Sequence, residues 1–327
     1  MSYSAKIEEE IRFYQDVTNV HDLPSIFHYW SSKYLQPKFE LLGFSNPDEF
    51  YIRYISRIAR SAPESNCKIL SLGAGNCDAE VRLSQVLAEI GIHNFTFDCL
   101  DINAQMLARG RQLAQEARLT PHFAFVESDI SGWETNDSYN IIIANQSLHH
   151  FVELEVLFEK ARQTLRDDGF FLTNDMIGRN GHMRWPEALE LVQALWSLLD
   201  EKHKWNCQLK RQEEVYENWD CSLEGFEGVR SQDILPLLLK TFQFDCFLGF
   251  ANLASVFVDR NFGPNFNITS QQDCNFIDFV AKLDDYFIES GKIKPTQMLA
   301  AMTKSGTADA KVYKHLTPEF CVRDPKL

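Results

Sequence analysis

The chain has 327 residues, of which 45% are hydrophobic and 24% charged, a composition that is typical of a globular protein and excludes a disordered or fibrous one. Its 46 acidic residues outnumber 32 basic ones, and no Lys/Arg cluster stands out, so we expect no nucleic-acid partner. The eight cysteines show no CxxC spacing, and the first residues, MSYSAKIEEEIRFYQ, lack the apolar run of a signal peptide, so we expect a cytoplasmic protein with reduced thiols, no metal site and no membrane span.

Residues 1–60 predict helices rich in aromatic residues, interrupted at Pro24, Pro37 and Pro47. From residue 68 onward, short apolar runs alternate with amphipathic helices, which is the pattern of βαβ units and a parallel sheet. The predicted strands are residues 68–72, 95–100, 123–127, 139–144 and 169–174.

The polar stretch 201–230 interrupts this pattern and predicts either an inserted lid or an ordinary surface helix with a loop. Two apolar runs, 244–250 and 254–259, are close enough to form an antiparallel hairpin at the sheet edge. We therefore expect a helical N-terminal cap at 1–65, an α/β core at 66–260 with the insertion 201–230, and a C-terminal helical extension at 261–327 that packs on the core.

The residues that follow each predicted strand carry the chemistry, because ligands of open α/β sheets bind beyond the carboxyl ends of the strands. The first strand is followed by Gly73-Ala74-Gly75, where glycines let the backbone approach a ligand closely. At the end of the second strand, the carboxylate of Asp101 can accept two hydrogen bonds from ribose hydroxyls, while Asn103 suits a helix cap. After the third strand, Asp129 could accept from an adenine amino group and Ile130 could cover the ring, although an aspartate in this place is by itself more often a helix cap or a turn residue.

Four motifs in succession, LSLGAGNCD, LDIN, ESDI and NQSLHHF, resemble those of class I S-adenosylmethionine-dependent methyltransferases over residues 66–260. The resemblance implies a Rossmann-like, seven-stranded, mainly parallel sheet with a reversed last strand, and S-adenosylmethionine as the cofactor. Ser71 departs from the pattern, since an acidic residue often stands there, and Asp78 would repel the pyrophosphate of a dinucleotide. The cofactor-binding residues implied are Gly73, Ala74, Gly75, Asp78, Asp101, Ile102, Met106, Asp129, Ile130, Asn145, Gln146 and His150.

His149 and Asp175 follow two neighbouring predicted strands, and their spacing resembles the His and Asp of sugar and natural-product O-methyltransferases. The resemblance implies that His149 is the base, or adjacent to it, and that Asp175 orients it or serves as an alternative base. A histidine that only packs over the cofactor or caps a helix is the simpler alternative, and His182 could be a further base.

Polar and aromatic side chains crowd the connection 174–186, where Arg179 and Arg184 could hold a carboxylate while Trp185 contacts substrate or only anchors the next helix. Tyr29, Trp30 and Tyr34 of the cap could form a lid over the substrate or simply the buried face of a helix.

The sequence thus favours a methyltransferase that acts on a small-molecule or peptide natural product, with O-methylation of a hydroxyl preferred. One alternative is carboxyl or N-methylation with Arg179 or Arg184 binding the substrate, and another is a cofactor-binding protein without catalysis. The C-terminal tail could equally mediate a homodimer.

Overall fold

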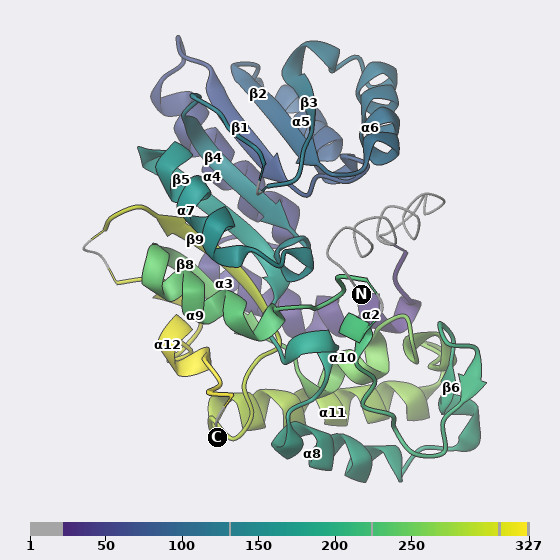
Figure 1. Cartoon of the computed structure of the whole chain (residues 1–327). Helices are drawn as coiled ribbons and strands as arrows, with labels where there is room; N and C mark the ends of the chain where they lie inside the picture. Colours follow the sequence, from purple (N-terminus) through teal and green to yellow (C-terminus); the bar gives the residue numbers. More distant parts are fainter. Residues whose placement is uncertain (1–21, 131, 224, 307–308, 326–327) are drawn as a thin grey trace.

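Eight strands form one central sheet in the computed structural model, which describes residues 22–130, 132–223, 225–306 and 309–325 (Figure 1). The strand order is β10-β8-β9-β5-β4-β1-β2-β3, with β1 to β5 parallel and β9 antiparallel to both β5 and β8. The bounds are β1 Cys67–Leu72, β2 Phe95–Asp101, β3 Phe123–Glu127, β4 Tyr139–Asn145, β5 Leu165–Met176, β8 Gln243–Phe250, β9 Gln297–Thr303 and β10 Lys311–Val312. The mainly parallel sheet with a reversed strand and all five strands predicted between residues 68 and 174 are confirmed. The sheet has eight strands rather than the seven expected, because the two-residue β10 pairs with β8.

The predicted hairpin over residues 244–259 is wrong in its second half, because α10 (Leu253–Val258) is a helix. Every residue of α10 is buried, and a short apolar run that is buried on all sides does not reveal its period in the sequence. The carboxylate of Asp284 accepts the N–H groups of Asn252, Leu253 and Ala254, which satisfies donors that a helix start leaves unpaired. The reversed strand is instead β9, from the C-terminal segment that we expected to lie outside the sheet as a helical extension.

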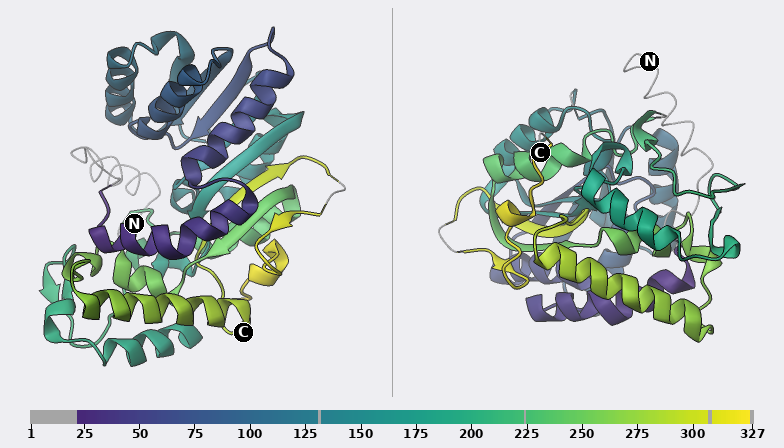
Figure 2. Two further views of the ribbon diagram at one scale, coloured as in Figure 1. Left: turned by 180° about the vertical axis from the view of Figure 1, so that it is seen from behind. Right: turned by 90° about the horizontal axis from the view of Figure 1, so that it is seen from below.

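Helices cover both faces of the sheet (Figure 2). On one face, α4 (Pro47–Ser61) contacts α5 (Asp78–Glu89), which contacts α6 (Ala104–Glu116), and on the other α7 (Leu154–Thr164) packs against α9 (Ser231–Thr241). Gly91 takes a left-handed conformation with φ of +78° just past α5, where the sequence predicts a helix end.

The N-terminal helices run through Pro37 without the predicted interruption. The chain passes from α2 (Ser25–Trp30) through a π-helical segment, η1 (Ser31–Leu35), into α3 (Gln36–Leu42). Pro37 is in the first turn of α3, where its missing N–H is least costly. Pro24 and Pro47 do mark helix starts. The N-terminal stretch read as lacking a signal peptide lies outside the described residues.

A second group of helices lies at one end of the sheet and consists of α2, α8 (Pro186–Trp196), α10 and α11 (Gln271–Glu289) (Figures 1 and 2). The insertion 201–230 holds a two-stranded sheet of β6 (Trp205–Asn206) and β7 (Arg211–Gln212) beside these helices. The remaining short elements are α12 (Pro318–Cys321) and the 3-10 turns η2 Thr120–His122, η3 Leu148–His150, η4 Asn180–His182, η5 Glu201–His203, η6 Cys221–Leu223 and η7 Gly263–Asn265. None of the helices in the described part of the chain is both long and apolar enough to span a bilayer.

Candidate functional site

The loop between β1 and α5 is held against the ends of β2 and β4. Gly73 and Gly75 have φ of +65° and +53°, a region that side-chain-bearing residues rarely adopt. The N–H groups of Gly73 and Ala74 both donate to the Leu100 carbonyl. A Cβ on Gly73 would lie 2.7 Å from the Ser147 Cβ, so only glycine allows this approach of β1 to the turn after β4. The predicted glycine loop therefore lies at the carboxyl edge of the sheet, and Asp78 begins α5.

Asp101 fixes that loop from the neighbouring strand. One carboxylate oxygen accepts the Gly75 N–H at 2.8 Å and the other accepts the Asn103 N–H at 2.8 Å. Asn103 caps α6 through the N–H groups of Gln105 and Met106, as the sequence predicts. These two bonds set the orientation of the Asp101 carboxylate.

The other predicted cofactor residues surround the same edge. Ile102 follows β2 and is half-buried, and the methyl carbon of Met106 would lie 3.1 Å from a Cβ on Gly75. Ile130 is buried after β3, while the carbonyl of Asp129 accepts the Gly132 N–H in a turn.

Glu80 provides a carboxylate that the sequence analysis missed. It lies in the first turn of α5, is buried, and accepts the Ser71 hydroxyl at 2.6 Å. Burial raises the pKa of the Glu80 carboxyl, an effect that the Ser71 hydrogen bond partly offsets. The acidic group absent at position 71 therefore comes from the following helix. A glutamate on the apolar face that also carries Val81 and Leu83 is the signal that could have revealed it.

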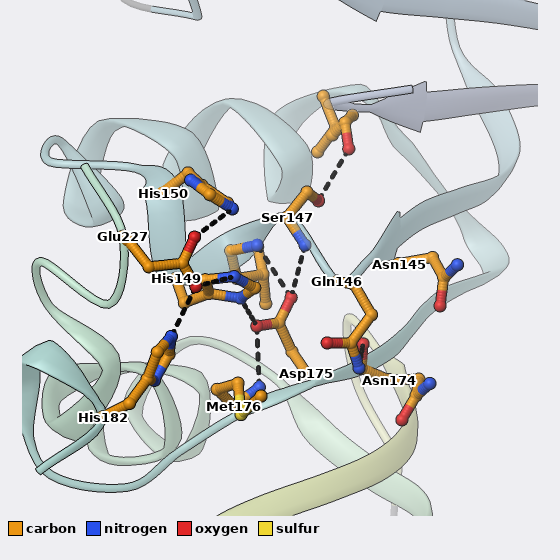
Figure 3. Close-up of polar contacts among 12 residues, drawn as sticks. Asn145, Gln146, Ser147, His149, His150, Asn174, Asp175, Met176, His182 and Glu227 are labelled. Atoms are coloured by element: carbon orange, nitrogen blue, oxygen red, sulfur yellow. Dashed lines mark hydrogen bonds and ion pairs between the residues drawn. The ribbon is translucent and has the colours of Figure 1, made fainter. Parts of the chain in front are cut away.

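His149 and Asp175 come together as predicted (Figure 3). The His149 Nδ1 lies 2.6 Å from Asp175 Oδ1, and both side chains are buried. The other carboxylate oxygen of Asp175 accepts the N–H groups of Ser147 and Leu148 at 2.8 and 2.7 Å. The Met176 N–H donates to Oδ1 at 2.8 Å, which completes four bonds to this carboxylate. Asp175 can therefore hold His149 as the tautomer with a proton on Nδ1, which leaves Nε2 as the working nitrogen.

Glu227, from the insertion 201–230, faces that nitrogen and was not predicted. Its Oε1 lies 3.5 Å from His149 Nε2 and 2.6 Å from His182 Nε2, and its Oε2 lies 3.6 Å from His150 Nε2 (Figure 3). Burial alone would lower the pKa of His149, but the carboxylates of Asp175 and Glu227 raise it to about 10. For His182, burial dominates and lowers the pKa despite the bond to Glu227. The insertion therefore contributes to the site rather than forming only a surface loop.

The backbone brings Glu227 and His182 together. The Gly181 N–H donates to the Gly228 carbonyl at 2.8 Å, and the Val229 N–H donates to the His149 carbonyl at 3.1 Å. Gly228 has φ of +66°, and a Cβ there would lie 3.0 Å from the His182 ring. The motif Gly225-Phe226-Glu227-Gly228, in which two glycines flank a carboxylate, is the local signal that could have indicated a built turn.

The arginines of the connection 178–185 have partners within the protein. The guanidinium groups of Arg179 and Arg323 both lie over the Trp185 ring, at 5.4 and 4.4 Å from the ring centroid. Arg184 donates to the Ser255 hydroxyl, and its backbone N–H donates to Asn218 Oδ1. These contacts match the alternative in which Trp185 anchors the start of α8, so substrate binding by Arg179, Arg184 and Trp185 stays a prediction.

The cap residues predicted to contact substrate also have structural partners. The Tyr29 hydroxyl donates to Asp278 of α11, and Lys33 bonds to both. Trp30 is buried in the hydrophobic core, and Tyr34 packs against that core. A lid role for these aromatic residues therefore stays a prediction.

Asn145 and Gln146, two of the predicted cofactor-binding residues, lie between the glycine loop and the His149–Asp175 pair. Asn145 accepts a hydrogen bond from the Tyr51 hydroxyl of α4. Gln146 has φ of +52°, and its N–H donates to the Asn174 carbonyl at 2.8 Å. The ends of β4 and β5 are thereby joined beside His149.

Residues 63–222 match a family model described as a methyltransferase domain. The chain is 31% identical over 116 residues to the highly reducing polyketide synthase GPY1 of Gibberella fujikuroi, an alignment that covers 34% of this chain and 4% of that protein. It is 28% identical over 157 residues to the non-reducing polyketide synthase sorB of Penicillium rubens, which covers 45% of this chain and 5% of that protein. The chain thus corresponds to only a small part of the length of these relatives.

Among solved structures, a geranyl diphosphate methyltransferase in complex with GPP and sinefungin superposes with a TM-score of 0.50. It is 10% identical and covers 92% of this chain and 100% of its own, so the two share a fold. The StiE O-MT is also 10% identical, with a TM-score of 0.46 and coverage of 91% and 92%. The strand order and the domain matched over residues 63–222 agree with the resemblance of the strand-end motifs to class I S-adenosylmethionine-dependent methyltransferases.

Proposed function

We propose that this chain binds S-adenosylmethionine at the glycine loop and transfers its methyl group to a hydroxyl of a small-molecule or peptide natural product. The observation that carries the proposal is the buried His149–Asp175 pair, which lies at the strand ends next to that loop. Ser147 joins the two parts, since its N–H donates to Asp175 and its hydroxyl donates to the Leu72 carbonyl, one residue before Gly73.

The cofactor half of the site fits this ligand on three grounds. Gly73 and Gly75 leave the backbone open at the start of α5, and the Asp101 carboxylate is oriented by two backbone N–H groups. Glu80 is a buried carboxylate whose charge an α-ammonium group would balance. We assign the ribose hydroxyls to Asp101 and the methionine ammonium to the Ser71–Glu80 pair.

S-Adenosylmethionine supplies an electrophilic methyl group on a sulfonium when it is bound. Transfer breaks the methyl–sulfur bond and forms a methyl–oxygen bond, so the acceptor hydroxyl must lose its proton. Neutral His149 takes that proton on Nε2, and the share of this neutral form grows as the pH rises toward its raised pKa of about 10. Asp175 keeps the proton on Nδ1 and balances the imidazolium charge. Because Asp175 is fully buried and accepts four N–H groups, we assign it the orienting role rather than that of a base.

The acceptor class rests on the relatives, which are named as polyketide synthases. Carboxyl or N-methylation would need Arg179 or Arg184 to bind the acceptor, and their contacts with Trp185 and Ser255 do not favour it. A binding protein without catalysis would have no need for a buried His149–Asp175 pair at the strand ends. A cytoplasmic location and a homodimer stay predictions.

Calorimetry with S-adenosylhomocysteine tests the cofactor half. We expect the wild-type chain to bind S-adenosylhomocysteine and the affinity of Asp101→Ala to be at least about tenfold lower, because a ribose hydroxyl loses its acceptor. Glu80→Gln should weaken binding of S-adenosylhomocysteine but leave binding of 5′-methylthioadenosine, which lacks the amino acid, unchanged. Equal losses for both ligands would contradict the assignment of Glu80.

Methyl transfer from labelled S-adenosylmethionine to fractionated small-molecule and peptide extracts tests the proposed catalytic role of His149 and Asp175. We expect His149→Gln to bind the cofactor as the wild type does but to lose transfer. The exposed His28 provides the control, since His28→Gln should transfer normally. Undiminished transfer by His149→Gln would refute the proposed base.

A further inference from the structure

Three chain segments that are distant in sequence place three metal-ligating atoms close together. His149 follows β4, His182 ends η4, and Glu227 comes from the insertion 201–230. The ring nitrogens of the two histidines and a carboxylate oxygen of Glu227 all lie within 4.8 Å of one another. Figure 3 shows Glu227 between the two rings.

The histidine that lies deepest already has the surroundings of a metal ligand. Nδ1 of His149 bonds to Asp175 at 2.6 Å, and metal-binding histidines almost always donate their other ring N–H to such a carboxylate. This bond directs the lone pair of Nε2 toward Glu227, at 3.5 Å from Oε1. Ligands of a tetrahedral ion at about 2.0–2.1 Å lie about 3.3–3.4 Å apart, close to that separation.

His182 is held by its backbone rather than by its contact with Glu227 alone. Its φ of +55° is in the left-handed region, where a residue with a side chain is strained. The bond from Gly181 to Gly228 and the missing side chain of Gly228 let this strained residue face the insertion. The 2.6 Å contact between His182 Nε2 and Glu227 is a bond that an ion can replace.

We propose that His149 Nε2, His182 Nε2 and the Glu227 carboxylate bind one divalent transition-metal ion of the Zn²⁺ type. Two imidazoles and one carboxylate suit zinc or iron rather than Mg²⁺ or Ca²⁺, which prefer oxygen ligands. Three protein ligands also leave a coordination position open. The two carboxylates, Asp175 and Glu227, balance the double charge of the ion. The cysteine spacing predicted no metal site, and ligands at 149, 182 and 227 form no short motif that would have indicated one.

Metal binding and base catalysis exclude each other at His149. This part of the inference rests on the proposed function, since the lone pair of Nε2 that takes the acceptor proton is the one that binds the ion. The metal-loaded chain is therefore an inhibited form of the methyltransferase.

Titration of the metal-free full chain with Co²⁺, followed by its visible absorption, and with Zn²⁺ by calorimetry tests the site. We expect one ion per chain, with affinity at least about a hundredfold weaker in His182→Ala and Glu227→Gln. His28→Ala is the matched control, because this exposed imidazole on α2 is outside the three-atom cluster, and its affinity should stay within about threefold. Thermal unfolding establishes that each variant is folded. Absence of stoichiometric binding, or equal affinity in all variants, would overturn the site.

Transfer assays separate this inference from the proposed function. Zn²⁺ should lower methyl transfer by the wild type, and a chelator should restore it. If the loaded chain transfers as fast as the metal-free chain, the inhibited state is refuted. If Zn²⁺ binds as expected and neither form transfers methyl groups, the metal site stands and the proposed function fails.

Discussion

Replacement of Asp175 by asparagine should reduce both the stability of the fold and methyl transfer. The carboxylate accepts four N–H groups, those of the His149 ring and of the Ser147, Leu148 and Met176 backbone. An amide of the same shape has only one oxygen, so in either orientation two of these donors face an NH₂ group. A buried donor without an acceptor costs about 1–3 kcal/mol, so the variant should lose about 2–6 kcal/mol of unfolding free energy.

Urea unfolding measures this loss. Asp167→Asn is the control, because the Asp167 side chain is 98% exposed and the same substitution there should change the free energy by less than about 0.5 kcal/mol. Transfer by Asp175→Asn should fall by about 10²–10⁴-fold with less effect on KM for the cofactor, because His149 loses the partner that fixes its tautomer. If Asp175→Asn is as stable as Asp167→Asn, the assignment of four acceptor bonds is wrong.

Two further substitutions test how the inserted half of the site is held. Gly181→Ala should destabilise the fold by about 1–3 kcal/mol more than Gly91→Ala, as measured by urea unfolding. Both glycines have positive φ, but only a Cβ on Gly181 would overlap a neighbouring side chain, that of Asp220. Equal losses would show that the overlap is relieved. Arg230 lowers the pKa of the Glu155 carboxyl to about 2 through their hydrogen bond, and a carboxyl with a lowered pKa stabilises above its unfolded pKa of about 4.5. At neutral pH, the free energy of unfolding of the wild type should therefore exceed that of Glu155→Gln by less than about 1 kcal/mol, because the pair is exposed. This difference should vanish as the pH falls to about 2. A difference that does not depend on pH would contradict the pairing.

The positions of the glycine loop and of Asp101 in the fold could be predicted because their signals are local. Each residue follows a strand that short apolar runs already reveal, and parallel strands end at one edge. The glycines at 73 and 75 and the cap at Asn103 have conformational causes that act within a few residues. The proximity of His149 and Asp175 also follows from this rule, since β4 and β5 are neighbouring parallel strands.

The rest depends on contacts between distant segments, which no local pattern encodes. Glu227 reaches His149 because Val229 bonds to the His149 carbonyl, 80 positions away in sequence. Residues 253–258 form a helix because Asp284 binds three N–H groups at its start. Glu80 was not predicted, because its place in the site depends on a hydrogen bond with Ser71 of the preceding strand.

The two halves of the site therefore differ in how they are held. Gly75 and Asp101 are fixed by bonds between adjacent strand ends, so their geometry depends on the central sheet. His182 and Glu227 are fixed by bonds between two connections that lie outside that sheet. Because connections change more easily than the elements they join, the proposed cofactor site can stay constant while residues 178–185 and 218–230 adapt to different acceptors. Acceptor specificity should accordingly follow these two segments when they are exchanged between related chains.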